Sequence, residues 1–213
     1  MKRIMIAGSL FLVFFASCNK DNNPTDKPVA DSVLDYMPLA VGNYWVYETF
    51  SCDSGGVDCV SQSVDTTRIT RDTVINDKKY YKLEGGAAFF PDLAYLRDSG
   101  DYLVNHQGII FFTCTDSLHL FNEQAILGQD SDTLFYWYNK LYLPAAPVQV
   151  GSGSYDCLDF RTLLFRQQDN FQTGHQTHHY YSKNIGLIKQ TSVFAISLKE
   201  FKRELVGYGP ANR

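Results

Sequence analysis

Five cysteines are the residues whose type and spacing bear most directly on chemistry. Cys18 closes an apolar N-terminal run and is treated with it below, which leaves Cys52, Cys59, Cys114 and Cys157. An exported chain reaches an oxidising compartment where cysteines pair, and four cysteines allow three pairings. Cys52 and Cys59 flank a short loop with two glycines, so we predict one disulfide there and a second between Cys114 and Cys157. No Cys-x-x-Cys spacing is present to indicate a redox or metal site.

Three histidines, His175, His178 and His179, are grouped like metal ligands. His175 and His179 would approach each other on a helix, but the surrounding pattern predicts a strand, on which they lie about 13 Å apart. The segment also lacks the glutamate that zinc hydrolases place between two histidines. We therefore predict solvent-facing or partly buried histidines, with no metal and no other cofactor.

Catalytic patterns are missing from the sequence. There is no Gly-x-Ser-x-Gly nucleophile turn, and Gly151-Ser152-Gly153-Ser154 lacks the lysine and the following helix of a phosphate-binding loop, so we interpret it as a turn. Asp156 and Asp159 could act as a glycosidase pair only if folding brings their carboxylates together. We predict no catalytic residue and no enzymatic activity, and the sequence leaves any ligand-binding residues unassigned.

The N-terminus carries an export signal. Lys2 and Arg3 precede an apolar run, Ile4 to Phe15, that is too short to span a bilayer. Its end, Phe15-Ala16-Ser17-Cys18, resembles the bacterial lipobox, with Phe15 in place of the usual leucine. We predict a signal peptide over residues 1–17 and a lipidated Cys18 whose palmitate-type acyl chains anchor the protein to a membrane.

The residues after the lipobox bear on localisation. Asn19 stands where an aspartate would resemble an inner-membrane retention signal, so we predict the outer membrane. Asn19-Lys20-Asp21 loosely resembles a tag that directs some lipoproteins to the cell surface, and the periplasmic and surface-exposed sides both remain open. The net charge is −4, and removal of Lys2 and Arg3 makes it more negative, which argues against a nucleic-acid partner.

The elements that must position these residues are strands. Residues 18–34 are rich in Asn, Asp, Pro and Lys and are expected to form a flexible tether. From residue 35 to 213 the chain has dense β-branched and aromatic residues, with 12 Phe and 14 Tyr, and frequent turn residues. This pattern predicts one all-β, mainly antiparallel domain: a single curled sheet, half-barrel or barrel-like sandwich with little helix.

Individual strands follow from the same pattern. Trp45 and Tyr47 lie in an expected central strand over residues 43–51, which is apolar on both faces. Asn76-Asp77 predicts a hairpin turn. A strand over residues 133–143 is expected to lead into a loop at Pro144 and Pro147, although a helix there is an alternative. The other expected strands cover 60–75, 79–83, 93–97, 102–105, 109–115, 157–166, 178–182 and 187–196, and the segment from 198 fits either a strand or a helix.

Two segments resemble a group of uncharacterised, β-rich bacterial outer-membrane lipoproteins. The first is Pro38-Leu39-Ala40-Val41-Gly42-Asn43-Tyr44-Trp45-Val46-Tyr47, and the second is Tyr180-Tyr181-Ser182-Lys183-Asn184-Ile185-Gly186-Leu187-Ile188-Lys189. The resemblance implies a β fold that extends from about residue 35 onward. It implies no activity, because the group has none to carry over.

Two function classes are compatible with these features. The first is a noncatalytic envelope lipoprotein that binds an apolar or glycan ligand in a concavity lined by its surplus aromatic residues. The alternative is a structural or assembly component of an outer-membrane complex. If the protein is such a structural component, the aromatic residues only fill the core.

Overall fold

The computed structural model describes residues 31–53, 56–86, 95–128, 130–193 and 199–210. Its elements within these residues are one short helix and twelve strands. They are α1 (Val33–Tyr36), β1 (Tyr44–Cys52), β2 (Cys59–Ile75), β3 (Lys78–Glu84), β4 (Tyr95–Asp98), β5 (Tyr102–Asn105), β6 (Ile110–Thr113), β7 (Phe121–Leu127), β8 (Thr133–Val150), β9 (Gly153–Arg166), β10 (Phe171–Ser182), β11 (Gly186–Val193) and β12 (Glu200–Gly209). The turn predicted at Asn76-Asp77 joins β2 to β3, and both residues have positive φ.

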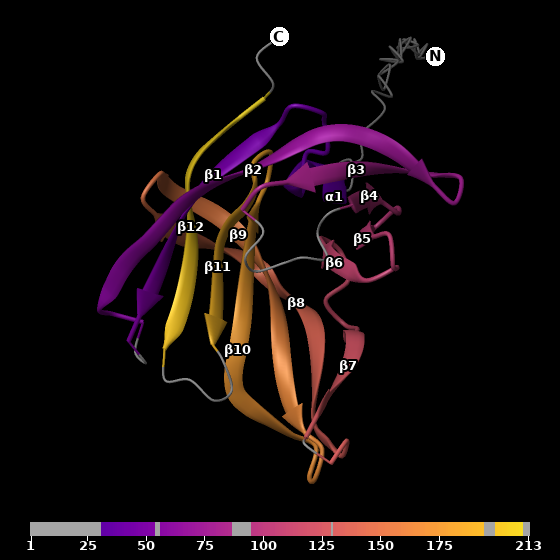
Figure 1. Ribbon diagram of the computed structural model, residues 1–213, viewed down its shortest axis with the longest axis vertical. Coiled ribbons are helices and arrows are strands. Elements are labelled where there is room, and N and C mark those ends of the chain that lie inside the picture. Colours follow the sequence, from indigo (N-terminus) through magenta and orange to yellow (C-terminus); the bar gives the residue numbers. More distant parts are fainter. Residues whose placement is uncertain (1–30, 54–55, 87–94, 129, 194–198, 211–213) are drawn as a thin grey trace, which may run out of the picture. The chain divides into compact units, whose positions relative to one another are not determined.

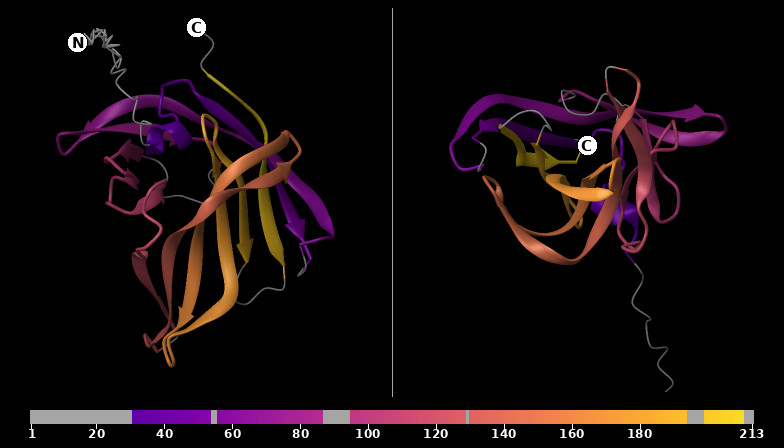
Figure 2. Two further views of the ribbon diagram at one scale, coloured as in Figure 1. Left: turned by 180° about the vertical axis from the view of Figure 1, so that it is seen from behind. Right: turned by 90° about the horizontal axis from the view of Figure 1, so that it is seen from below.

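The strands form a single antiparallel sheet in the order β6-β5-β4-β3-β2-β1-β12-β11-β10-β9-β8-β7 (Figure 1). Strands that are consecutive in the chain pair with each other, except for β6 and β7, which are the two edges of the sheet. At the centre, β1 pairs with the C-terminal β12. The sheet curls strongly (Figure 2), so that its two edge strands, β6 and β7, approach each other. The predicted all-β, barrel-like fold with little helix is confirmed.

One asparagine side chain joins the two edges of the sheet. Asn122 of β7 accepts a hydrogen bond from the Ile110 backbone N–H of β6 at 3.0 Å and donates one to the Ile110 carbonyl at 2.5 Å. The amide therefore replaces a peptide group in a strand ladder and satisfies edge groups that would otherwise be exposed. A third bond, from Asn122 Nδ2 to Asn139 Oδ1 at 2.9 Å, ties this contact to β8.

Side chains that alternate along the strands point into the barrel and form its core. Trp45 is 2% exposed on the central strand β1, as predicted, and its Nε1–H donates to the Ile185 carbonyl at 2.6 Å. Phe112 packs against Tyr181 with ring centroids 4.3 Å apart and against Phe160 at 6.1 Å. The aromatic residues at this level of the barrel therefore fill the interior.

Helix α1 packs over one end of this core. Ser32 and Asp35 form a capping box, Val33 is fully buried, and the Tyr36 ring lies 5.5 Å from that of Phe112. Asp31 also forms an ion pair with Lys183. The compact unit thus begins at Asp31, a few residues before the predicted boundary, because these residues supply apolar and charged contacts to the domain.

Strand β8 continues through the two prolines that were expected to begin a loop. The ladder with β9 is interrupted between Tyr142 and Ala146 and then resumes, with Pro147 opposite Asp156. Pairing of β8 with β7 ends at Asn139, so beyond that point β8 has a strand on one side only within the described residues. A proline is tolerated there because its missing N–H can face the unpaired side.

Two further strands bear on the sequence predictions: β7 was not expected, and β12 decides between the two structures left open for the C-terminal segment. Strand β7 was not predicted, since only Phe121 of its seven residues is buried and the usual alternation is absent. The segment after residue 198 is the strand β12, in which Phe201, Arg203 and Leu205 share one face. Its pairing with β1 and β11 decides between the strand and the helix that the sequence left open.

The structure contains the Cys52–Cys59 disulfide, so this pairing is confirmed. The predicted second disulfide is wrong: Cys114 and Cys157 are both free and buried. Cys114 follows β6 at one edge of the sheet, whereas Cys157 lies on β9, the third strand from the other edge. Their Sγ atoms contact different groups, the carbonyls of Asp31 and Tyr155. Burial raises the pKa of the Cys114 thiol to about 11 and that of Cys157 to about 12.

The closure by Asn122 predicts a loss of stability in Asn122→Gly, which keeps a residue suited to φ 57° but removes the side chain. Loss of its hydrogen bonds should lower the free energy of unfolding by about 2 kcal/mol, measured by urea denaturation. Asn170→Gly is the matched control, because Asn170 has φ 52° in an exposed turn. Equal stability of the two variants would contradict the closure.

The free thiols predict a specific labelling pattern. Iodoacetamide at neutral pH should leave Cys114 and Cys157 unmodified in the folded protein, because burial holds both in the neutral thiol form. After denaturation without reductant both should be alkylated, while the Cys52 and Cys59 peptides stay linked. Peptide mapping by mass spectrometry measures this, and a Cys114–Cys157 peptide would contradict it.

Candidate functional site

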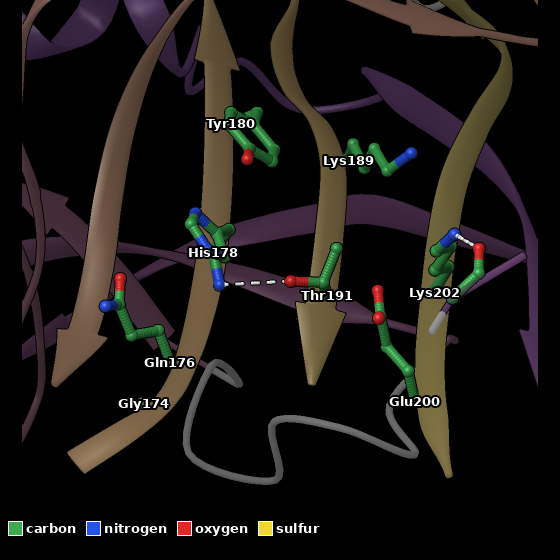
Figure 3. A pocket seen from close by; sticks show the side chains of 9 residues that line it. Gly174, Gln176, His178, Tyr180, Lys189, Thr191, Glu200 and Lys202 are labelled. Atoms are coloured by element: carbon green, nitrogen blue, oxygen red, sulfur yellow. Dashed lines mark hydrogen bonds between the residues drawn. The ribbon is translucent and has the colours of Figure 1, made fainter. Parts of the chain in front are cut away.

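The outer face of strands β10, β11 and β12 carries a polar cavity of about 530 Å³ (Figure 3). Tyr181, Ile188 and Leu205 of these strands belong to the core, so the residues that alternate with them point away from the barrel interior. The residues that line the cavity are Gly174, Gln176, His178 and Tyr180 of β10, Lys189 and Thr191 of β11, Glu200 and Lys202 of β12, and Gly56 of the β1–β2 loop. No large aliphatic side chain is among them.

Strand register places these side chains together. His178 lies opposite Thr191, which in turn lies opposite Lys202, so three consecutive strands contribute one row. Cross-strand neighbours of this kind have their Cβ atoms about 5 Å apart on the same face. Gly56 reaches the row because the disulfide-closed loop turns toward β12, where its carbonyl accepts a hydrogen bond from Lys202 Nζ. A Cβ at Gly56 would lie 2.6 Å from Glu200 Oε2, and its φ of +66° is a conformation that residues with side chains rarely adopt.

His178 is held in a fixed orientation. Its Nδ1 lies 2.9 Å from Asp159 Oδ2, and its ring stacks on that of Tyr180 with centroids 5.5 Å apart and planes 9° apart. The backbone N–H of His178 donates to Thr191 Oγ1 (Figure 3). With Nδ1 engaged by the carboxylate, Nε2 is the ring nitrogen that is able to meet a ligand.

Asp159 connects this histidine to an arginine. Arg161 Nε donates to Asp159 Oδ2 at 2.6 Å, its Nη1 donates to Gln176 Oε1 at 3.3 Å, and the guanidinium lies 3.9 Å from the Tyr142 ring centroid. The glycosidase pair considered from the sequence is not formed. Asp156 and Asp159 are separated by an odd number of positions on β9, so their side chains point to opposite faces.

The charges around the cavity balance. Lys189 forms an ion pair with Glu204 at 2.6 Å, and Lys202 stands near Glu200, with both side chains close to Gly56. Two lysines thus face two glutamates, and Asp159 is matched by Arg161. Such a site gives no net attraction to either sign of ion, and its donors and acceptors suit a neutral polar ligand.

The three histidines singled out in the sequence have different positions. His178 lies in the cavity, His175 is exposed, and His179 points into the barrel with Nδ1 3.0 Å from the Phe160 carbonyl. Burial lowers the pKa of His179 to about 4. Among the described residues no group of three or more His, Cys, Asp or Glu side chains is arranged to hold a metal ion.

The other cavity residues were not identified from the sequence. Gln176, Tyr180, Lys189, Thr191, Glu200 and Lys202 line the site. Alternation of polar and apolar residues separates Glu200 and Lys202 from Phe201 and Leu205 on β12, whereas β10 carries polar residues on both faces and gives no such signal. That alternation says which face a residue occupies, but not which strands are neighbours. The β1–β12 and β11–β12 ladders join segments whose order in the sheet the sequence did not reveal.

Comparisons with known proteins give a fold likeness only. No protein-family model and no curated protein matches the chain. One similar solved structure is a protein of Parabacteroides distasonis ATCC 8503, classed provisionally as a lipoprotein, with 10% identity, a TM-score of 0.42, and coverage of 82% of this chain and 98% of that chain. Another is a provisionally exported protein with a YmcC-like fold from Bacteroides fragilis NCTC 9343, with 9% identity, a TM-score of 0.38 and the same coverages.

Likenesses at this level assign neither activity nor ligand to this chain. The resemblance of two sequence segments to β-rich lipoproteins stays a prediction. No helix in the described part of the chain has both the length and the apolar character needed to cross a bilayer.

The buried His179 predicts acid sensitivity. Its pKa is about 4 in the folded state and near 6.5 in the unfolded state, so below pH 6.5 only the unfolded state takes up a proton. Stability is therefore fully present above about pH 6.5 and falls by about 3 kcal/mol as the pH approaches 4.

Urea denaturation at about pH 7 and about pH 4.5 should show this loss in the wild type but a smaller loss in His179→Gln, which retains a donor for the Phe160 carbonyl. His175→Gln, at an exposed histidine, is the control and should behave as the wild type does. The same pH dependence in all three proteins would contradict the assignment.

Proposed function

We propose that the protein is a lipid-anchored, noncatalytic envelope protein that binds a neutral, hydroxyl-rich ligand of glycan type in the cavity on β10–β12. The observation that carries this proposal is the cavity itself, with amide, hydroxyl, imidazole, ammonium and carboxylate groups in charge balance. Sugars offer many hydroxyl groups that both donate and accept hydrogen bonds. A lining with donors and acceptors from three strands can match them.

An apolar ligand has less support than a glycan. The aromatic residues that suggested an apolar concavity, including Trp45, Phe112 and Phe160, are buried in one core, where Phe112 packs against Phe160 and fills the barrel near α1. In the outer cavity the aromatic groups are Tyr180 and the stacked imidazole of His178. Rings beside hydrogen-bonding groups suit the mixed surface of a sugar better than a hydrocarbon chain.

The membrane anchor is proposed at Cys18, which lies outside the described residues. The chain from Cys18 to Asp31, fully extended, spans at most about 45 Å. Acylation contributes about 0.8 kcal/mol for each buried methylene, which suffices for stable attachment when more than one chain is present. The outer membrane is the proposed location, on the strength of Asn19 at the position after the cysteine.

Glycan binding predicts loss of affinity in Lys202→Gln, which removes a charged donor from the cavity. The mature lipidated protein in detergent, tested on a glycan array and then by calorimetry, should bind at least one glycan, and the variant should bind it about tenfold more weakly. Lys78→Gln is the control, because Lys78 is exposed on β3 away from the cavity. Absence of glycan binding, or equal losses in both variants, would refute the proposal.

Anchoring predicts that Cys18→Ala abolishes incorporation of a clickable fatty-acid analogue. Because the acyl chains would be the hydrophobic anchor after signal-peptide removal, the variant should also leave the membrane fraction or remain unprocessed. Wild type and variant are compared by in-gel fluorescence after metabolic labelling. A Cys114→Ala variant is the control for unspecific thiol labelling, and equal labelling of Cys18→Ala and wild type would overturn the anchor.

A second candidate function, assembly into an envelope complex, is favoured by an apolar end of the sheet. Large apolar side chains are exposed on three strands there: Ile126 and Leu127 of β7, Leu134 and Trp137 of β8, and Phe171 of β10. Exposed apolar groups that gather at one end of a sheet are typical of contact surfaces, and here β7 and β8 are neighbours while β9 separates β8 from β10. Replacing Leu127 and Phe171 by serine should reduce the size of the native particle on blue native gels if this end mediates assembly.

A further inference from the structure

The disulfide between β1 and β2 lies beside the outer cavity. Cys52 is opposite Cys59 on β2 and opposite Glu200 on β12, so the disulfide stands in one cross-strand row with a residue that lines the cavity. Side chains directly opposite each other share a face of the sheet, which places the disulfide on the outer face. Cys52 is 3% exposed, whereas Cys59 is exposed to solvent.

Gly56 is the residue of the β1–β2 loop that contacts the cavity. Its carbonyl accepts a hydrogen bond from Lys202 Nζ, and Cys59 Sγ lies 3.6 Å from the same carbonyl oxygen. A Cβ at Gly56 would come within 2.6 Å of Glu200 Oε2 and 3.1 Å of Lys202 Nζ. Gly56 thus contacts both the disulfide and two charged side chains of the cavity.

Hydrogen bonds within the loop set its shape. Asp53 Oδ1 accepts from the backbone N–H groups of Val57 at 2.8 Å and Asp58 at 3.3 Å, and the Gly56 N–H donates to the Asp53 carbonyl at 3.0 Å. These groups all belong to the loop, so their hydrogen bonds would move with it. The disulfide is instead a covalent link across the base of the loop. By restricting the separation of the two loop ends, it limits how far Gly56 can move from Lys202.

A lysine side chain that is held in place binds a ligand at a lower entropic cost than a free one. Lysine has a long flexible stem, and ordering such a side chain on binding weakens affinity by about two- to tenfold. The Gly56 carbonyl occupies one of the three N–H donors of Lys202, and the other donors can still meet a ligand. Contact with the loop therefore prepares Lys202 for binding.

We propose that the Cys52–Cys59 disulfide, acting through Gly56, positions Lys202 in the outer cavity, so that the ligand site is complete only in the oxidised protein. This inference rests on the proposed function, because the ligand is the same glycan-type molecule. Gly56 is a positioning residue, and the disulfide makes its position dependent on the redox state of two cysteines. A chain whose cysteines are reduced is expected to bind the ligand more weakly.

Reduction by a dithiol proceeds by thiol–disulfide exchange. A thiolate of the reductant attacks the exposed Cys59 Sγ, the S–S bond breaks, and Cys52 leaves as a thiolate that takes up a proton. The second thiolate of the reductant then attacks the first sulfur of the reductant, and Cys59 leaves and takes up a proton. Two electrons have passed to the protein, which holds two thiols, and the reductant has become a disulfide. Gly56 is then free to move away from Lys202.

The first test measures Lys202 itself and needs no ligand. The mature lipidated full chain in detergent, either oxidised or reduced with dithiothreitol, is acetylated with acetic anhydride, and the rate at each lysine is measured by peptide mass spectrometry. Lys202 must leave the Gly56 carbonyl before it can react, so its rate should rise severalfold on reduction. Lys189 is the internal control: it lines the same cavity, is paired with Glu204, and should keep its rate.

Gly56→Ala tests the positioning with the disulfide intact. The added Cβ would meet Glu200 and Lys202, so the loop must shift and Lys202 should react faster in the oxidised protein. Gly100→Ala is the matched control, because Gly100 has a φ of +71°, close to the +66° of Gly56, but nothing lies within 4 Å of its Cβ position. This control carries a similar backbone strain and should leave Lys202 unchanged. Urea denaturation of each variant and of the reduced protein verifies that all are folded during labelling.

The second test measures affinity by calorimetry for a glycan found on the array. The reduced wild type and oxidised Gly56→Ala should bind this glycan about two- to tenfold more weakly than the oxidised wild type, and Gly100→Ala should bind it equally well. If no glycan binds, the proposed function fails, whereas the acetylation rates still decide whether the disulfide positions Lys202.

Three results would overturn the proposal. Equal Lys202 rates in the oxidised and reduced proteins would mean that the loop keeps its place through its own hydrogen bonds. An equal rise at Lys202 and Lys189 would mean that reduction loosens the whole outer face. Faster reaction of Lys202 with unchanged glycan affinity would mean that the fixed position of this side chain does not serve binding.

Discussion

The ladder between β1 and β12 is the contact on which the rest of the structure depends. Among the pairings of the described strands it alone joins segments that are far apart in the chain, and it unites a meander of β1–β6 with a meander of β7–β12. It brings Arg203 to Asp65 and Tyr47, and Lys202 to the Gly56 loop. Without it neither the buried contacts of Arg203 nor the outer cavity would be complete. Such long-range pairing carries a large entropic cost of loop closure, which the burial of Trp45, Tyr47 and Leu205 must offset.

Closure at the opposite side of the barrel relies on a different device. The edge strands β6 and β7 share no regular ladder in the described residues, and the amide of Asn122 makes the two hydrogen bonds that a peptide group would make. A side-chain amide can make these two hydrogen bonds where the backbones of two strands are not aligned to form a ladder. The edge is thereby protected against pairing with another chain.

Polar groups are arranged differently on the two faces of β10–β12. On the outer face, donors and acceptors surround an open cavity with balanced charge, and His178 is oriented by Asp159 and Tyr180. On the inner face, Gln190 and Arg203 are buried among fixed neighbours. Strand alternation makes both possible on the same three strands, because adjacent residues such as Lys189 and Gln190 point in opposite directions. The sheet thus offers a candidate ligand site on its outer face and buried polar contacts on its inner face.

The sequence by itself determined the local features of this protein. Alternating and aromatic residues indicated the strands and the buried central position of Trp45, Asn76-Asp77 indicated a hairpin, and the short glycine-containing loop indicated the Cys52–Cys59 disulfide. These depend on residues close in the chain, where spacing fixes geometry. Strand β7 was not predicted because buried and exposed residues do not alternate along it. Strand β8 continues past Pro144 and Pro147 because its second half pairs with β9 only, among the described strands.

Only the tertiary structure decided which strands are neighbours. The predicted Cys114–Cys157 disulfide was wrong because β6 and β9 are not adjacent, and sequence spacing contains no information on that distance. For the same reason the outer cavity, with residues from β10, β11, β12 and the Gly56 loop, could not be assembled from the sequence. The row of His179, Gln190, Arg203 and Thr49 likewise exists only through register across four strands. A strand's own pattern sets the face of each side chain, whereas its cross-strand partners are set by long-range pairing that the whole sheet decides together.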